Sequence, residues 1–190
     1  MNDNIESVLN ELIETSKDGE KGFLKSAEDS HSAELKAVFT EGAQRCREGA
    51  RELQEQVRAL GGDPEESGSM TGALHRGWIS VKEAVTSRDD KAILEECERG
   101  EDYAKNAYRK ALEKDLPANV RSIVERQYQG VLQNHDRVRA LRDRYRASGE
   151  AANSSIGRQQ AAQTGSSDGT GRQQSGMVGE GWPKSSQQDD

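Results

Sequence analysis

The chain has 190 residues, of which 32% are hydrophobic and 32% charged, and its formal net charge is −7. This length allows one domain with an additional segment, and the shortage of apolar residues excludes a globule that is compact along its whole length. The negative charge argues against nucleic acid and anionic membranes as partners. No apolar run reaches the roughly 18 residues that a transmembrane helix needs. We therefore expect long helices with narrow apolar stripes, diluted by a disordered segment.

The cysteines and the first residues indicate the compartment. Cys46 and Cys97 are isolated, and they form neither a C-x-x-C motif nor a disulfide framework. The acidic start, MNDNIESVLNELIE, lacks the basic residues of a secretory signal. Both observations predict a reducing, cytoplasmic location.

The first part of the chain predicts a helical hairpin. Apolar residues recur three and four positions apart over about 4–28 and again over about 32–60, as on one face of a helix. The joint between them, EDSHS, is so short that the two helices should be antiparallel neighbours. Gly61-Gly62 and Pro64 then form a strong helix stop.

A long connection separates this hairpin from the next. It begins with the flexible sequence GGDPEESGS and continues with Leu74, Trp78, Ile79, Val81 and Val85, which predict a short extra helix. A connection of this length can travel the whole bundle, so the helices that it joins would be parallel.

The second hairpin is predicted from its start and stop signals. Ser87 and Asp90 have the S-x-x-D spacing of a capping box, so the third helix should begin near Ser87. It should end before KDLP, because a residue that precedes proline is pushed out of the α region. The fourth helix opens with Pro117 in its first turn and continues to about Ala147. Four helices with one long central crossover form the ferritin-like arrangement.

An extended coiled coil is the alternative fold. It needs uninterrupted heptads, whereas glycines interrupt the helical stripes, and each costs about 1 kcal/mol relative to alanine. Several of them would mark places where helices approach closely. They are Gly19, Gly22, Gly42, Gly49, Gly100 and Gly130.

The composition changes near Ser148. Residues 148–190 are rich in Gly, Ser and Gln and have no periodic apolar pattern, so they cannot bury enough surface to offset their ordering entropy. We predict a helical bundle over 1–147 and a disordered tail over 148–190. Trp182 is the bulky feature of this tail, either as a solvated aromatic or as a docking or processing point.

Ferritin-like di-iron proteins suggest where a metal site would lie. They take one Glu from each of two helices and an E-x-x-H motif from each of the other two. The first helix offers Glu20 and the third offers Glu101. The second helix has Cys46 and Gly49 at the motif positions, and Leu132 stands where the glutamate partner of His135 should be. The sequence thus argues against a full di-iron site.

Two arrangements of the remaining residues stay open. Glu20, Glu101 and His135, with or without Cys46, would form a reduced site that zinc could accept. Alternatively, the two glutamates flank the core and His135 donates a hydrogen bond to one of them in a buried seam. We expect the second arrangement, with no metal and no other cofactor held.

Two further constellations have simpler interpretations. The literal E-x-x-H motif, Glu28 to His31, falls at the turn between the first two helices, where we expect a surface histidine. A thiol-dependent activity of Cys97 with His135 would need an orienting third group and a cleft, and the sequence shows neither.

Two stretches of the sequence resemble a known family. ECERGEDYAKNAYRKALEKDLPANVRSIVERQYQGVLQNHDRVRALRD, 95–143, is similar to the second hairpin of a bacterial family of ferritin-like four-helix bundles. RALGGDPEESGSMTGALHRGW, 58–78, is similar to its crossover. The resemblance covers roughly 1–147, and the family is a domain of unknown function. It implies a small bacterial protein with a link to stress, and it supplies no reaction.

These observations favour one function over two others. We expect a non-enzymatic structural or interaction protein that forms a homodimer through part of a helix face. The alternative is a metal-binding protein with the reduced site of Glu20, Glu101 and His135, and a thiol-dependent activity is the third hypothesis.

Overall fold

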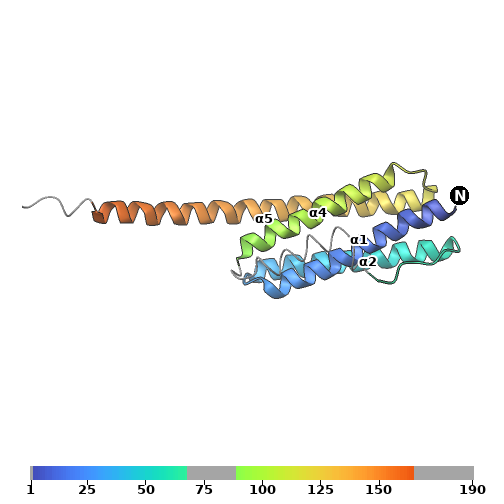
Figure 1. Ribbon diagram of the computed structural model, residues 1–190, viewed down its shortest axis with the longest axis horizontal. Helices are drawn as coiled ribbons and strands as arrows, with labels where there is room; N and C mark the ends of the chain where they lie inside the picture. Colours follow the sequence, from blue (N-terminus) through green and yellow to red (C-terminus); the bar gives the residue numbers. More distant parts are fainter. Residues whose placement is uncertain (1, 68–88, 165–190) are drawn as a thin grey trace, which may run out of the picture. The chain divides into compact units, whose positions relative to one another are not determined.

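The computed structural model describes residues 2–67 and 89–164, and these form an all-α structure with four helices. Figure 1 shows the helices packed side by side as a bundle. Their bounds are Asn2–Asp29 for α1, Ala33–Ala59 for α2, Asp90–Leu112 for α4 and Ala118–Thr164 for α5. The predicted four-helix bundle is therefore confirmed, whereas the short helix predicted in the crossover lies outside the described residues.

The chain divides into two units, Met1–Glu150 and Ala151–Asp190. The first holds the bundle, and in the second the helical residues 151–164 are described. The prediction that the last helix ends near Ala147 was wrong. The sequence EAANSSIGRQQAAQ has no apolar period but is rich in Ala and Gln, which are strong helix formers. Adding residues to an existing helix also avoids the cost of nucleation.

Contacts between neighbouring helices show their directions. In each neighbouring pair the residue numbers rise along one helix as they fall along the other, so all these neighbours are antiparallel. The pairs are Ser16–Tyr108 and Ser30–Asp90 for α1 and α4, Tyr108–Gln127 and Glu98–Arg142 for α4 and α5, and Glu41–Arg137 and Gln56–Asn119 for α2 and α5. Since the short turn makes α1 and α2 antiparallel too, α2 and α4 run parallel, as the long crossover predicts.

The buried apolar side chains form two clusters, one toward each end of the bundle. Burial of each large side chain contributes about 1.5–3 kcal/mol, so these clusters hold the helices together. The first cluster includes Leu9, Leu12, Leu53, Val57, Val120 and Val124. The second cluster includes Phe23, Leu35, Phe39, Leu94, Val138 and Leu141. The mid-length of the bundle, between the two, is occupied largely by polar and small residues.

Local hydrogen bonds define the helix starts. The Ser32 hydroxyl accepts from the Leu35 N–H at 3.4 Å as the N-cap of α2. The N-cap of α4 is Asp89, whose carboxylate accepts from the Lys91 N–H at 3.0 Å, so the capping box predicted from Ser87 was wrong. Asp90 instead accepts from the Ser30 hydroxyl at 2.7 Å, which joins the start of α4 to the α1–α2 turn.

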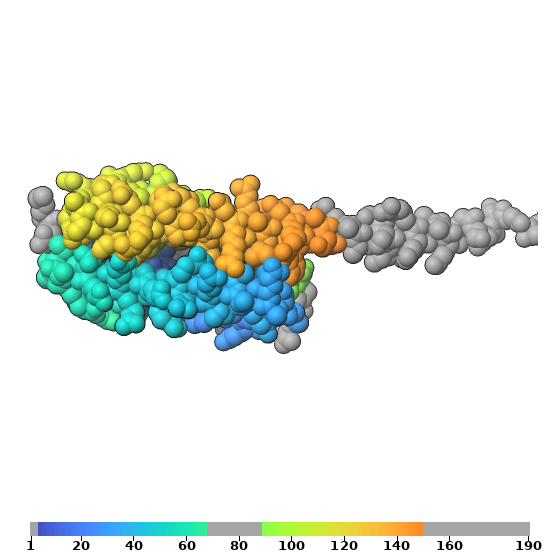
Figure 2. Space-filling model, turned by 180° about the vertical axis from the view of Figure 1, so that it is seen from behind, coloured from blue at the N-terminus to red at the C-terminus, as the bar shows by residue number. Residues whose placement is uncertain are grey.

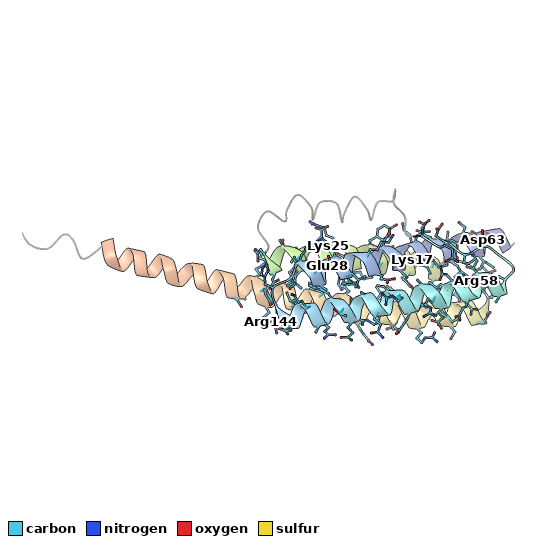
Figure 3. The ribbon with its side chains drawn as sticks, turned by 90° about the horizontal axis from the view of Figure 1, so that it is seen from below. Lys17, Lys25, Glu28, Arg58, Asp63 and Arg144 are labelled. Atoms are coloured by element: carbon cyan, nitrogen blue, oxygen red, sulfur yellow. The ribbon has the colours of Figure 1, made fainter. Side chains whose placement is uncertain are left out.

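The chain after α2 folds back along α1. Gly61 has a φ of 78°, which glycine adopts readily, and it ends α2 as predicted. The Asp63 N–H then donates to Glu6 at 3.0 Å, and the Lys17 ammonium donates to the Glu66 carbonyl at 2.9 Å. Figure 3 shows Arg58 and Asp63 at the same end of the bundle. None of the helices described here is long and apolar enough to cross a membrane.

Candidate functional site

A cavity of about 590 Å³ lies at mid-length in the bundle, between the two apolar clusters. All four helices contribute to its wall. Exposed charged residues, including Arg51, Glu55 and Arg126, line it on the side of α2 and α5. Figure 2 shows the surface hollowed between these two helices. The bundle therefore has a chamber of ligand size that opens on one face.

Glycines shape the walls of this cavity in two ways. A Cβ at Gly19 would lie 3.1 Å from the Cys46 sulfur, and one at Gly42 would lie 3.2 Å from the Phe23 ring. These two glycines permit close approach of α1 and α2, as expected from the sequence. A Cβ at Gly130 would meet no atom of the described residues within 4 Å. Gly130 thus leaves open space beside α5 that a larger side chain would fill.

Asn134 connects two charged groups in the wall. Its amide nitrogen donates to Glu101 Oε1 at 2.7 Å, and its amide oxygen accepts from Arg45 Nη2. Glu101 is 6% exposed, and its second oxygen, Oε2, is buried without a hydrogen-bond partner in the described structure. Burial raises the pKa of Glu101 to about 7, although the Asn134 hydrogen bond and the Arg45 charge act to lower it. A residue with a buried carboxyl group, one oxygen of which has no partner among the described residues, therefore contributes to the cavity wall.

A second chain of hydrogen bonds crosses the cavity wall from α1 to α2. The Ser16 and Tyr108 hydroxyls lie 3.2 Å apart, and the Tyr108 hydroxyl donates to Gln127 Oε1 at 2.9 Å. The Gln127 amide in turn donates to Glu52 at 2.7 Å, and Arg126 pairs with the same carboxylate. These partners satisfy polar groups that would otherwise be costly to bury.

The two thiols are both protonated near neutral pH. Burial raises the pKa of each of Cys46 and Cys97 to about 12. Cys97 donates to the Ser26 hydroxyl at 3.2 Å, while Cys46 lines the cavity. The third hypothesis, a nucleophile pair of Cys97 and His135, has no support from the geometry, because Cys97 donates to Ser26 and His135 lies beside Asp102.

The three candidate metal ligands engage different partners. Glu20 forms an ion pair with Arg47 at 2.7 Å. Glu101 accepts from Asn134, and His135 Nε2 lies 3.1 Å from Asp102 and 3.2 Å from Lys105. Within residues 2–67 and 89–164, no three carboxylate, imidazole or thiol groups gather where they could hold a metal ion.

The prediction that His135 donates a hydrogen bond to Glu20 or Glu101 was wrong, because its ring lies beside Asp102 instead. The burial expected for His135 is confirmed. Residues 120, 124, 127, 131, 134, 138 and 141 step by three and four along α5, so Asn134 lies on the stripe and His135 one residue beyond it, where it meets Asp102. Continuing this stripe through its polar members would have identified both Gln127 and Asn134. The surface position expected for His31 is confirmed, since this residue is exposed at the turn.

Fold and site together define a helical bundle protein with a polar chamber at its centre. The sequence profile of a family described as a domain of unknown function, DUF2383, matches residues 4–114, and the chain belongs to this family. The match covers the span from α1 through α4 and ends before α5, so it is shorter than the resemblance over 1–147. No curated protein matches the chain.

Proposed function

We propose that this protein is a non-enzymatic, ferritin-like bundle that binds a small organic molecule in its central cavity. The cavity itself is the observation that carries the proposal. Its volume of about 590 Å³ lies within the range of small-molecule sites, which is on the order of 300–1,000 Å³. The parallel α2 and α4, joined by a long crossover, support the ferritin-like assignment.

The lining of the cavity has the mixture that ligand sites use. Phe23, Ala104 and Val131 provide apolar wall, while Glu101 and Arg45 provide polar groups that converge from opposite helices. Close packing normally fills the interior of a bundle, because an unfilled space loses dispersion contacts and burial. A chamber kept open by Gly130 therefore suggests selection for an occupant.

Binding without turnover is supported by the chemistry of the lining. Nucleophilic catalysis needs an activated group, and burial keeps the Cys46 thiol protonated at neutral pH. Burial also raises the pKa of the Tyr108 hydroxyl, which a hydrogen bond with Ser16 partly opposes. Glu101 titrates near neutrality, but no nucleophile in the described cavity wall forms a hydrogen bond with its second oxygen, Oε2.

The setting of the protein is proposed on more general grounds. Two free thiols support the reducing environment of the cytoplasm, and the family resemblance supports a bacterial protein linked to stress.

A homodimer through α1 and α4 is supported by Leu24 and Tyr103, which are large apolar side chains exposed on these helices. Light scattering over a range of concentrations would contradict the dimer if the chain stayed monomeric throughout.

A ligand screen tests the proposed binding function. Melting of the full chain is followed with a library of small organic molecules, in parallel with Gly130→Leu, whose side chain enters the cavity. A ligand at a hundred times its Kd stabilises by about 2.7 kcal/mol. We expect at least one compound class to raise the melting temperature of the wild type and not of the variant. Equal responses of both proteins, or none, would contradict the proposal.

The alternative candidate is the metal-binding protein with Glu20, Glu101 and His135 as ligands. The free Oε2 of Glu101 is the observation that favours it. The separate partners of Glu20 and His135 weigh against it. A direct test by metal analysis is given in the Discussion.

A further inference from the structure

We infer, building on the proposed ligand-binding function, that the cavity takes a zwitterion of the α-amino acid type. Its ammonium group would donate to Glu101 Oε2, and its carboxylate would accept from Arg45. The inference rests on one unpartnered buried oxygen, one cation beside it and the amide that separates the two.

Glu101 supplies the acceptor. Its Oε1 already accepts from Asn134 at 2.7 Å, whereas Oε2 is buried and has no partner among the described residues. An unsatisfied buried oxygen costs on the order of 1–3 kcal/mol, and more when it carries charge. Oε2 is closed off from the cavity in this structure, so a ligand with an N–H donor removes this cost once the Glu101 side chain turns toward the cavity. An ammonium group does so with a charge-assisted hydrogen bond, which is about twice as strong as a neutral one.

Arg45 supplies the donor. It is partly buried, lines the cavity and uses Nη2 for its hydrogen bond to the Asn134 oxygen. A guanidinium group has five N–H donors in a planar fork, and the fork matches the two oxygens of a carboxylate. The remaining donors of Arg45 can therefore receive the carboxylate of the ligand.

The hydrogen bonds of Asn134 show how a ligand must arrange its donor and its acceptor to contact both Glu101 and Arg45. Its side-chain amide presents a donor to Glu101 and an acceptor to Arg45. An α-amino acid presents the same order, because its ammonium and carboxylate groups are on one carbon atom. A simple amine would satisfy Glu101 but be repelled by Arg45, and a simple carboxylate would have the reverse problem. The site therefore discriminates in favour of a zwitterion.

The rest of the chamber indicates the kind of side chain. The cavity of about 590 Å³ is larger than the charged ends of an amino acid require, and Phe23, Ala104 and Val131 provide apolar wall. Burial of apolar area stabilises binding by about 25 cal/mol per Å². We therefore expect amino acids with apolar side chains, such as leucine and phenylalanine, to bind better than glycine.

The titratable groups around Glu101 make binding depend on pH. Arg45 and Cys46 face it from α2, and His135 faces it from α5. On α4 the titratable neighbours are Cys97, Asp102 and Tyr108. The described cavity wall of α1 contributes Thr15, Ser16, Gly19 and Phe23, which do not titrate. The free carboxyl is partly protonated at neutral pH, because burial raises its pKa to about 7. The ammonium needs the ionised form, so affinity should rise from pH 6 to pH 8 with release of a proton.

Titration calorimetry on the full chain tests this inference with matched compounds. L-leucine is compared with 4-methylpentanoate, which lacks the amine, and with 3-methylbutylamine, which lacks the carboxylate. L-phenylalanine is compared with 3-phenylpropanoate and 2-phenylethylamine in the same way. We expect each amino acid to bind at least tenfold more tightly than either partner compound, with proton release at pH 7 detected from buffers of different ionisation enthalpy.

Variants locate the site. Glu101→Gln and Arg45→Gln should each weaken amino acid binding at least tenfold, and Glu101→Gln should also remove the pH dependence. Glu20→Gln is the matched control, since Glu20 pairs with Arg47 and does not line the cavity, and it should bind as the wild type does. Because these comparisons include ligand pairs on the wild type, they remain decisive even where a variant fails to fold.

The outcomes separate this inference from the function on which it rests. Equal affinity for an amino acid and its partner compounds, or no binding at millimolar concentration, overturns the zwitterion. If another compound class from the screen still binds the wild type but not Gly130→Leu, the binding function stands and its ligand is of that class. If no class distinguishes the two proteins, both the inference and the proposed function fail.

Discussion

Glu101 has a carboxyl group in a position that a helix bundle ordinarily fills with an apolar side chain. It takes a position between Cys97 and Ala104 on the apolar stripe of α4, and its carboxyl group is buried where most helices would place leucine. In the folded chain its pKa is raised to about 7 from an ordinary value of 4.5, mainly by burial. The folded state therefore keeps a proton that the unfolded state has already lost in this range.

This difference makes a prediction about stability and pH. Between about pH 4.5 and 7 the unfolded chain binds fewer protons at Glu101 than the folded chain does. The free energy of unfolding therefore falls as the pH rises through this range and levels off above it. Glu101→Gln removes this dependence. Relative to the wild type, the variant should gain on the order of 3 kcal/mol between pH 4.5 and pH 8.

Urea unfolding of both proteins at a series of pH values measures this gain. Glu20→Gln serves as the control and should run parallel to the wild type, because Glu20 is half-buried and its carboxylate already has Arg47 as a partner. Parallel curves for Glu101→Gln and the wild type would show that the buried carboxyl group does not titrate as the structure indicates.

Metal content is the second prediction at the scale of single residues. Because Glu20 and His135 engage Arg47 and Asp102, we expect protein purified without a chelating tag to contain far less than one transition metal ion per chain. Elemental analysis measures this content. About one ion per chain, lost in His135→Ala, would instead establish the reduced metal site.

The sequence located some of these residues and missed others. Glu101 could be predicted because it continues the spacing of the α4 stripe. Asn134 was not predicted, because histidine is a metal ligand and the prediction therefore used His135, one residue off the stripe. A difference of one residue turns a helical side chain by about 100°, so Asn134 lines the cavity and contacts Glu101 while the equally buried His135 contacts Asp102.

At the scale of the helices, glycine positions distinguish close packing from open space. Gly42 and Gly130 both interrupt the interior of a helix, so the sequence alone cannot tell which of them lies at a close contact between helices. The structure separates them, because the Phe23 ring lies against Gly42, whereas in the described part of the chain nothing lies within 4 Å of a Cβ at Gly130. Which helix approaches which glycine is a property of the packed bundle.

A pair of alanine substitutions tests this distinction. Gly130→Ala should stabilise the protein by about 0.5–1 kcal/mol, the gain in helix propensity. Gly42→Ala should be less stable than Gly130→Ala by about 2 kcal/mol, because its Cβ would press on the Phe23 ring and overpack the core. Denaturant unfolding measures both, and equal effects would show that Phe23 moves aside freely.

For the whole molecule, the boundary between the two units predicts the effect of truncation. The apolar clusters of the bundle draw on residues up to Tyr145. We expect deletion of 148–190 to change the melting temperature by less than about 2 °C, because the apolar clusters that hold the bundle together end before residue 148. Differential scanning calorimetry of both chains is the measurement. A drop of several degrees would mean that the deleted segment packs on the bundle.

The sequence by itself determined the helices, their pairing and the parallel direction of α2 and α4, because apolar period, glycine and proline stops and connection lengths are local properties of the chain. It did not determine where α5 ends, because beyond Ser148 the helix continues without an apolar stripe that could predict it. The tertiary structure alone decided that Glu101, Asn134 and Arg45 meet beside an open cavity. These residues come from three helices, and their meeting depends on the rotation and spacing of packed helices, which no single helix encodes.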